Sequence, residues 1–260
     1  MSLSYKQAVA QRFSAAASRY NRVARLQRSV CTHLFQLLPM PLDVTTLLDL
    51  GAGTGYGSHL LKQHFTSARI LALDLALGML NQLQQEVQTP ALICADMENL
   101  PLKANCLDLI FSSLAVQWSL NFSQTLNQCF HVLRPGGIFA FSTVLEGSLI
   151  EFKHSWSQVD ERQHINTFRT LAQYHKLCAQ SGFDTLLIQP QTQRYFYDDI
   201  AQLRHELRDL GANHIQTGRQ PHLAARQRLE KLQQAYERYR TPAGLPATWN
   251  LLYVILKKPA

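Results

Sequence analysis

The chain has 260 residues, a formal net charge of +7 and a hydrophobic fraction of 46%, which fits one large domain or one domain with an appended segment. No stretch approaches the roughly 18 consecutive apolar residues of a membrane-spanning helix, and the first residues lack the apolar core of a secretory signal, so we expect neither. Five widely spaced cysteines without a C-x-x-C pair indicate free thiols in a reducing cytoplasm, and ten histidines without ligand spacing indicate no metal site.

The positive charge is unevenly placed along the chain. Residues 1–40 hold six cations and no acid, residues 41–150 hold four cations and eight acids, and residues 201–240 hold eight cations and four acids. The two cationic segments are either solvated helix faces or a docking surface for an acidic partner, because clustered charge of one sign steers association.

The first predicted element is a helix within a basic segment, residues 1–42. Its apolar side chains recur at helical spacing on one face: Val23, Leu26, Val30, Leu34 and Leu37. Arg22, Arg25 and Arg28 fall to the side and back of that face, and Pro39 and Pro41 end the helix. The pattern predicts a lid or packing helix with a basic outer surface.

Strand and helix patterns then alternate from residue 46 to residue 143. The expected strands are 46–50, 70–74, 91–95, 107–112 and 138–143, and the expected helices are 57–65, 76–88 and 121–133. A turn at 134–137 precedes the fifth strand. Strands separated by helices of this length predict a parallel, doubly wound α/β sheet with right-handed crossovers.

Two further strands are expected after this alternation, at 184–197 and 249–258, with a helix at 167–180 closed by Gly182. Between these strands lie about fifty residues that read as two helices, 198–210 and 222–240. Because a minimal doubly wound domain needs only a short loop there, the insertion is expected to cover the site. The expected organisation is a core at 43–197, a helical cover at 198–245 and a final core strand at 246–260.

The turn after the first strand carries the most informative motif. Gly51, Gly53 and Gly55 alternate after Leu47–Leu50, and glycine lets a ligand approach the backbone closely. A dinucleotide fingerprint needs its third glycine at position 56, which is Tyr56. The observed G-x-G-x-G spacing, which includes Ala52 and follows Asp49, resembles motif I of the S-adenosylmethionine-dependent methyltransferases.

Polar residues at the ends of the next strands complete a candidate cofactor site. Asp74 could accept hydrogen bonds from a ribose diol, Asp96 could accept from an adenine amino group, and Met97 could pack on the ring. The expected set also holds Leu75, Met79, Ser112 and Ser113. Taken singly, each is as readily a capping, surface or core residue, but together they end successive strands in the order that S-adenosylmethionine binding requires.

Stretches outside this core carry a more specific resemblance. They are Arg12–Tyr20, Ala24–Gln27, Asp96–Pro101, Leu114–Trp118, Val159–Asp160, His164–Phe168, Leu210–Asn213 and Leu245–Trp249. Together they resemble the malonyl-acyl carrier protein O-methyltransferases of biotin synthesis over nearly the whole chain. The chain departs from the family pattern at Ala52, Ser113 and Trp249, where Cys, Asn and Tyr are frequent.

The resemblance implies a Rossmann-like class I methyltransferase with a seven-stranded sheet, an N-terminal helix and a helical cover between the last two strands. It implies transfer of methyl from S-adenosylmethionine to the free carboxylate of a malonyl thioester, giving the methyl ester primer for pimeloyl synthesis. The carrier would be acyl carrier protein, bound through the basic helices, or coenzyme A. We further expect a cytoplasmic monomer that binds no nucleic acid, membrane or metal.

Few catalytic side chains are needed for this reaction. A carboxylate with a pKa of about 4 is already ionised at pH 7, so the enzyme has to align the reactants and exclude water. Tyr20 and Gln117 are the candidates for positioning the methyl transfer, and Trp118, His164, Asn166 and Phe168 are the candidates for the acyl side. An arginine is also expected to meet the carboxylate, from among Arg162, Arg169, Arg204 and Arg219.

Other functions stay open from the sequence alone. A methyltransferase acting on another small acceptor, such as a quinone precursor, would share the whole core. An RNA methyltransferase is suggested by the pI of about 9.3, although no RNA-binding module is recognisable. A non-catalytic S-adenosylmethionine-binding protein would need damage in the motif, which is intact, and Tyr56 argues against a nicotinamide dehydrogenase.

Overall fold

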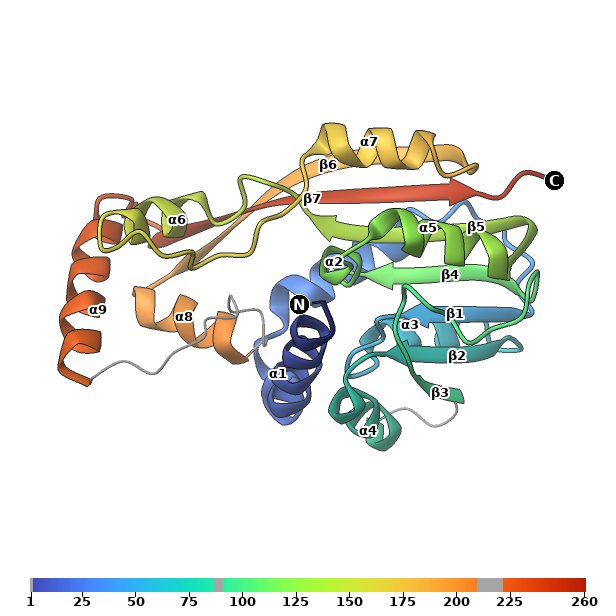
Figure 1. Cartoon of the computed structure of the whole chain (residues 1–260), viewed down its shortest axis with the longest axis horizontal. Helices are drawn as coiled ribbons and strands as arrows, with labels where there is room; N and C mark the ends of the chain where they lie inside the picture. Colours follow the sequence, from blue (N-terminus) through green and yellow to red (C-terminus); the bar gives the residue numbers. More distant parts are fainter. Residues whose placement is uncertain (1, 87–90, 210–221) are drawn as a thin grey trace.

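The computed structural model describes residues 2–86, 91–209 and 222–260. Its centre is one seven-stranded sheet in the order β3-β2-β1-β4-β5-β7-β6 (Figure 1). The strands are β1 (Thr46–Leu50), β2 (Arg69–Asp74), β3 (Ala91–Cys94), β4 (Leu107–Ser113), β5 (Leu133–Val144), β6 (Asp184–Tyr197) and β7 (Leu245–Lys257). The first five strands are parallel, and β7 runs antiparallel between β5 and β6. The doubly wound seven-stranded sheet expected from the sequence is thus confirmed.

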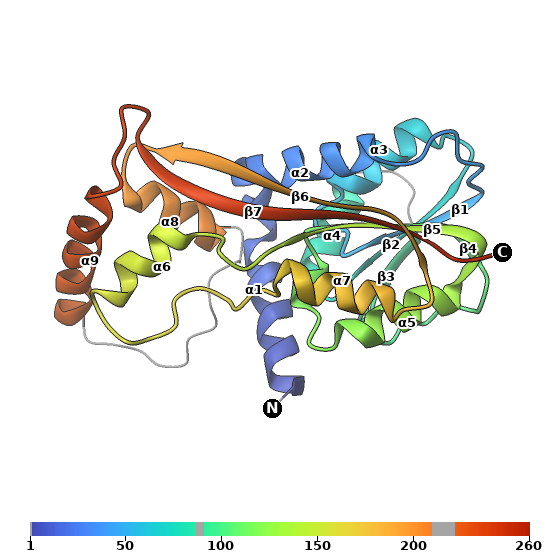
Figure 2. The same cartoon turned by 90° about the horizontal axis from the view of Figure 1, so that it is seen from above.

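Helices cover both faces of the sheet (Figure 2). They are α1 (Ser2–Val23), α2 (Arg25–Gln36), α3 (Tyr56–His64), α4 (Leu77–Glu86), α5 (Phe122–Val132), α6 (Ile150–Ser157), α7 (Leu171–Ala179), α8 (Ile200–Asp209) and α9 (His222–Glu237), with a short 3-10 turn at Val116–Trp118. One buried cluster joins α2 and α3 to the sheet, and a second joins α5 and α7 to the opposite face. Successive side chains of β7 belong alternately to the first and the second cluster, because neighbouring side chains of a strand point to opposite faces of the sheet.

The N-terminal segment forms two helices rather than one, with a break at Ala24. Leu26, Val30 and Leu34 are buried against the sheet, so α2 is a packing helix, whereas α1 lies beyond the carboxyl ends of the central strands (Figure 1). Arg25 and Arg28 are exposed, as predicted. Their guanidinium groups lie over the rings of Tyr195 and Tyr56, at 4.7 and 5.8 Å from the ring centroids.

Two local predictions differ from the structure. Helix α6 was not predicted, although its Phe152 and Trp156 follow helical spacing and join the core with α9. Strand β5 begins at Leu133, so the predicted turn at 134–137 lies within the strand. It begins earlier because the backbone of Gly136 and Gly137 is already bonded to Lys258, beyond the end of β7.

The insertion between β6 and β7 contains the two predicted helices, α8 and α9, at the end of the molecule where α6 also lies (Figure 1). Tyr236 of α9 donates a hydrogen bond to the Pro246 carbonyl over 2.8 Å and packs on Phe152 of α6. The motif at Leu210–Asn213 and the candidate Arg219 lie outside the described residues. The division of the chain at residues 43, 198 and 246 stays a prediction.

In the part of the chain that the structure describes, every helix is too short or too polar to cross a membrane. The same residues contain no group of three or more His, Cys, Asp or Glu side chains placed to hold a metal ion.

Candidate active site

The turn between β1 and α3 has a backbone that favours glycine. Gly51, Gly53 and Gly55 have φ angles of +75°, +56° and +96°, in the left-handed region. A Cβ atom on Gly51 would lie 2.2 Å from the Cβ of Ala115, so no side chain fits there. The Gly51 backbone N–H donates to the Leu73 carbonyl over 2.7 Å, which fixes the turn against the end of β2.

Asp74 at the end of β2 is bound to the same turn. Its carboxylate accepts hydrogen bonds from the backbone N–H groups of Gly53 and Ala76, at 2.9 and 2.8 Å. Burial raises the pKa of Asp74, while the backbone donors act in the opposite direction. The carboxylate is therefore held in a fixed orientation at the edge of a cavity.

This first cavity lies at the carboxyl ends of β1 to β4, where ligands bind in doubly wound sheets. Its empty volume is about 780 Å³, part of which is open to solvent. Eight of the twelve predicted cofactor residues line it: Gly51, Gly53, Asp74, Leu75, Met79, Asp96, Met97 and Ser113. Most of the predicted cofactor residues thus lie around one cavity at the strand ends, and the role of each residue stays a prediction.

Four predicted residues do not line the first cavity and instead support its wall. Asp49 is buried and accepts a hydrogen bond from the Ser58 hydroxyl over 2.6 Å. Burial raises the pKa of Asp49 to about 7. Ser112 donates its hydroxyl to the Leu50 carbonyl over 2.7 Å. Ala52 packs among buried side chains behind the turn, and Gly55 begins α3. Their positions therefore favour support of the cavity wall over direct contact with the cofactor.

Helix α1 covers the first cavity with one face. The lining residues on that face are Lys6, Val9, Ala10, Phe13 and Tyr20. Sequence analysis singled out only Tyr20 among them. Their spacing of three, one, three and seven residues is a helical stripe, so the same periodicity argument could have found them.

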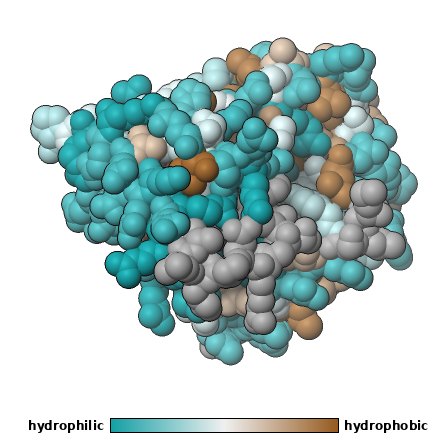
Figure 3. All heavy atoms as spheres, turned by 60° about the vertical axis from the view of Figure 1, so that its left-hand side comes forward, coloured by the Kyte–Doolittle hydropathy of each residue, from teal (hydrophilic) through white to brown (hydrophobic). Residues whose placement is uncertain are grey.

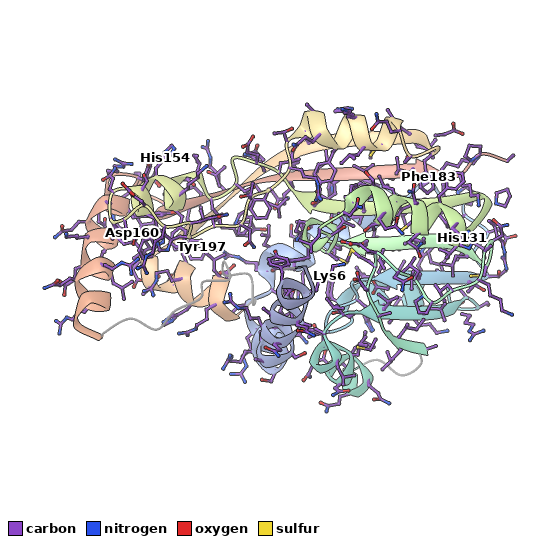
Figure 4. All side chains as sticks on the ribbon, viewed as in Figure 1. Lys6, His131, His154, Asp160, Phe183 and Tyr197 are labelled. Carbon is purple, nitrogen blue, oxygen red and sulfur yellow. The ribbon has the colours of Figure 1, made fainter. Side chains whose placement is uncertain are left out.

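Three sets of contacts attach α1 to the core. Lys6 forms ion pairs with Asp96 and Glu98, at 2.6 and 2.8 Å (Figure 4). Ser14 accepts a hydrogen bond from the Gly78 backbone over 3.1 Å, and a Cβ on Gly78 would lie 2.7 Å from the Ser14 Cα.

The third set is near the end of the helix. Asn21 accepts from the Thr54 hydroxyl over 2.6 Å and donates to both Glu86 carboxylate oxygens, at 2.8 and 2.9 Å. The helix predicted as a lid or packing helix is α2, which packs on the sheet, whereas the lid over the first cavity is α1, which was not predicted as a separate helix.

A second cavity, with an empty volume of about 670 Å³, adjoins the first. The two share Phe13, Tyr20, Leu114 and Trp118 as common wall. The second cavity is also lined by every residue predicted for methyl transfer and the acyl side: Tyr20, Gln117, Trp118, His164, Asn166 and Phe168. Residues from three distant segments therefore meet around one space, and their chemical roles stay predictions.

Most of the second cavity's wall is apolar, and hydrogen bonds hold Gln117 and His164, two of its polar side chains, in fixed orientations. Burial raises the pKa of Tyr20 far above its usual value, so its hydroxyl stays protonated. Gln117 donates its amide to the Leu114 carbonyl over 2.6 Å. Phe13 meets Trp118 edge to face, with 5.2 Å between ring centroids.

His164 is held on the other side of this cavity. Its ring stacks on Trp156 with 3.6 Å between centroids, and its Nε2 lies 2.8 Å from an Asp160 carboxylate oxygen. Arg228 of α9 pairs with the same carboxylate, which Figure 4 shows at the α6–α9 end of the molecule. Burial lowers the pKa of His164 despite the opposing effect of Asp160, which favours the uncharged imidazole.

A third cavity lies on the outer side of the segment 158–168. It has an empty volume of about 1070 Å³, including space open to solvent, and shares His164, Ile165, Asn166 and Phe168 with the second. The three cavities therefore adjoin in a row, from the glycine turn to the region between α6 and the 158–168 segment.

The arginines proposed for a carboxylate do not reach the second cavity among the described residues. Arg162 lines the third cavity instead. Arg169 donates to the Ser119 carbonyl over 3.1 Å, and its guanidinium lies 5.6 Å from the Phe122 ring centroid. Arg204 on α8 does not line the second cavity. The expected arginine contact is thus not formed by these three residues.

Known proteins match both the sequence and the fold. Residues 48–141 match the family model described as methyltransferase domain. A malonyl-[acyl-carrier protein] O-methyltransferase from Dechloromonas aromatica is 35% identical over 97% of this chain and 95% of its own. The biotin biosynthesis bifunctional protein BioHC of Cellvibrio japonicus is 41% identical over 98% of this chain and 50% of its own. The chain spans about half the length of the bifunctional relatives it matches.

Among solved structures, phospholethanolamine N-methyltransferase 2 of Haemonchus contortus, in complex with S-adenosylhomocysteine and phosphomonomethylethanolamine, matches with a TM-score of 0.56. It is 17% identical, and the match covers 88% of this chain and 52% of that one. At this identity the likeness concerns the fold alone, and it agrees with the predicted class I methyltransferase fold.

Proposed function

We propose, since the chain belongs to the family of malonyl-[acyl-carrier protein] O-methyltransferases, that it methylates the free carboxylate of a malonyl thioester in biotin synthesis. The methyl donor is S-adenosylmethionine, and the carrier of the malonyl group is acyl carrier protein. The observation that carries this proposal is the shared wall between two cavities, because a methyl transfer needs donor and acceptor side by side.

The first cavity suits the donor. Gly53 leaves space for a ligand against the turn, because a Cβ there would meet no atom within 4 Å. Asp74 retains lone-pair capacity for a ribose diol, since an ionised carboxylate can accept about four hydrogen bonds and its described donors are the backbone N–H groups of Gly53, Leu75 and Ala76. Asp96 and Met97 lie where an adenine edge and face would be met.

The second cavity suits the acceptor. S-adenosylmethionine supplies an electrophilic methyl group when bound, so the chain's own residues have only to position and desolvate the carboxylate. Phe13, Leu114 and Trp118 exclude water from the shared wall, and Tyr20 presents a protonated hydroxyl there. The substrate carboxylate needs no base, because it is already ionised at pH 7. His164, whose pKa burial lowers, therefore does not have to take a proton from it.

The third cavity offers a route for the carrier's arm, and exposed cations lie beside it. Arg226, Lys231, Arg238 and Arg240 are exposed on and after α9, whose Arg228 holds Asp160 at the cavity wall. The end of the molecule formed by α6 and α9 presents a mainly hydrophilic surface (Figure 3). Acyl carrier proteins are acidic, so this charge favours docking here over a neutral carrier.

The direct experiment is an assay of the purified chain with S-adenosylmethionine and malonyl-acyl carrier protein, following the methyl ester by mass. We expect an increase of about 14 Da on the malonyl group, and faster turnover with the carrier protein than with malonyl-coenzyme A. Methylation of a quinone precursor or of RNA, with an unchanged malonyl thioester, would replace this proposal by one of the other acceptor classes.

We include in the proposal a cytoplasmic monomer. All five cysteines are free, as in a reducing compartment. Sedimentation of the purified chain at micromolar concentration tests the monomer directly.

A further inference from the structure

Two residues that line the second cavity each carry a buried polar atom with no hydrogen-bond partner among the described residues. The atoms are Nε1 of Trp249, on β7, and Oε1 of Gln27, on α2. Trp249 is only 6% exposed, so its indole N–H has no water-facing alternative. One of the two atoms is a donor and the other is an acceptor.

Such atoms destabilise a folded protein, because a buried donor or acceptor without a partner loses its hydrogen bond to water and forms no other in exchange. Most buried polar atoms are therefore paired, and each exception calls for an explanation. Other buried unpaired atoms occur in this structure, but Gln27 and Trp249 are the two on the second cavity's wall among the described residues. A ligand in that cavity whose polar groups reached these two atoms would pair both.

The described part of the second cavity's wall contains no lysine or arginine. Its one titratable base, His164, is paired with Asp160, and burial lowers its pKa. A carboxylate entering this space therefore meets neutral groups, with Asp49 and Asp74 buried nearby beyond the glycine turn. The positive charge that favours its entry comes from the methyl donor itself.

We propose that the second cavity binds the malonyl thioester through uncharged protein groups, with Trp249 Nε1–H donating to a carboxylate oxygen and Gln27 Oε1 accepting from an amide N–H of the carrier's arm. This inference rests on the proposed function. It assigns to Trp249 and Gln27 the recognition that the sequence suggested for an arginine.

The chemistry of the transfer explains why a neutral donor suits this place. A lone pair of the free carboxylate oxygen forms the new O–CH₃ bond while the S–CH₃ bond breaks, and its electrons return to sulfur. The anion and the sulfonium become a neutral ester and a neutral thioether. A bidentate arginine would stabilise the anion most before the reaction and would occupy both oxygens, which raises the barrier. A single N–H leaves one oxygen free to attack.

The decisive variant is Trp249→Phe, which removes the N–H and keeps an aromatic ring. We expect KM for malonyl-acyl carrier protein to rise about 10-fold or more, as for the loss of a hydrogen bond to a charged group. The dissociation constant of S-adenosylmethionine should stay within twofold of the wild type. Replacement of Trp249 by 3-benzothienylalanine, which exchanges N–H for sulfur with the same shape, should give the same rise.

Tyr253→Phe is a matched control. Tyr253 lies on the same strand, and its hydroxyl is likewise buried and unpaired, but it lines neither the second cavity nor the first. Its removal should leave KM unchanged. An equal rise in both variants would show a general effect on β7 and overturn the inference.

Gln27→Met separates the two ends of the ligand. We expect it to raise KM about 3- to 10-fold for malonyl-acyl carrier protein and not at all for a malonyl methyl thioester, which has no amide. Trp249→Phe should affect both substrates. Wild-type turnover of malonyl-acyl carrier protein with unchanged KM in Trp249→Phe would overturn this inference alone, whereas an inactive wild type would overturn the proposed function.

Discussion

Lys6 of α1 and Glu98 of the segment after β3 form an ion pair over 2.8 Å that ties the N-terminal helix to the core. Glu98 also accepts hydrogen bonds from the backbone N–H groups of Leu120 and Asn121, at 2.7 and 3.0 Å. Burial acts to raise the pKa of Glu98, but Lys6 and these donors hold it below its usual value. One carboxylate thus connects the lid to the segment that follows Trp118.

Lys6→Met should therefore loosen the lid. We expect the affinity for S-adenosylmethionine to fall about 10-fold, which corresponds to about 1.4 kcal/mol, within the range for a charge-assisted hydrogen bond. Titration calorimetry measures this directly. Lys62→Met is the matched control, because Lys62 of α3 donates only to the Thr66 carbonyl, just after that helix, among the contacts described, and its loss should leave the affinity unchanged.

The same ion pair predicts a pH dependence with a definite sign. Because the folded-state pKa of Glu98 lies below its usual 4.5, the pair stabilises the fold fully above that pH and is lost as the pH falls further. Urea unfolding of wild type and Lys6→Met should differ at pH 7, and the difference should shrink as the pH falls below 4.5. A difference that grew on acidification would contradict the role given to Glu98.

The raised pKa of Asp49 predicts a pH dependence of stability with the opposite sign. Its pKa rises from 3.8 to about 7 through burial, so between these values the folded chain holds a proton that the unfolded chain has released. Raising the pH through that window should lower the free energy of unfolding. In Asp49→Asn we expect this loss to disappear and the protein without cofactor to gain at least about 1 kcal/mol at pH 8. Parallel pH profiles for the two proteins would refute this.

The strand ends explain how much of the site was predictable. Gly51, Asp74, Asp96 and Ser113 end successive parallel strands, and the topology brings all such ends to one edge of the sheet. Asp49 and Ser112 lie in the same motifs as the residues that line the cavity. Their spacing in the sequence therefore could not show whether they support the cavity wall or contact the cofactor.

The rest depended on relationships that spacing does not contain. The stripe through Lys6 and Phe13 became a cavity wall only because α1 lies across the strand ends. Trp249 faces the second cavity because β7 inserts antiparallel between β5 and β6, and the direction of that last strand could not be derived from periodicity. Whether a buried N–H has a partner is likewise a property of the packed structure.

Gly51→Ala should disable the site by two separable causes. The new Cβ would lie 2.2 Å from that of Ala115, and the φ of +75° costs an L-residue about 1–2 kcal/mol. We expect at least 10-fold weaker S-adenosylmethionine binding and a lower Tm. Adding Ala115→Gly removes the clash but not the backbone strain, so the double variant should recover part of the loss. Recovery to wild-type affinity would show that backbone strain contributes nothing.

Charge reversals decide where the carrier docks. Sequence analysis placed it on the basic helices, including Arg22, Arg25 and Arg28, but Arg25 and Arg28 lie over tyrosine rings and line none of the three adjoining cavities. Helix α9 contacts the wall of the third cavity through the Arg228–Asp160 pair, and Arg226, Lys231 and Arg238 are exposed on and just after this helix. We expect Arg226→Glu, Lys231→Glu and Arg238→Glu together to raise KM for malonyl-acyl carrier protein about 10-fold at low salt, and less at high salt, because screening weakens such attraction.

The matched triple reversal, Arg22→Glu, Arg25→Glu and Arg28→Glu, should have the smaller effect on KM. With a malonyl methyl thioester, which needs no docking surface, both triple variants should retain wild-type turnover. A larger rise from the second triple variant would move the docking surface to the junction of α1 and α2, which carries Arg22, Arg25 and Arg28. Loss of turnover with the small thioester would instead show that the reversals disturb the fold, because that substrate reaches the second cavity without a protein partner.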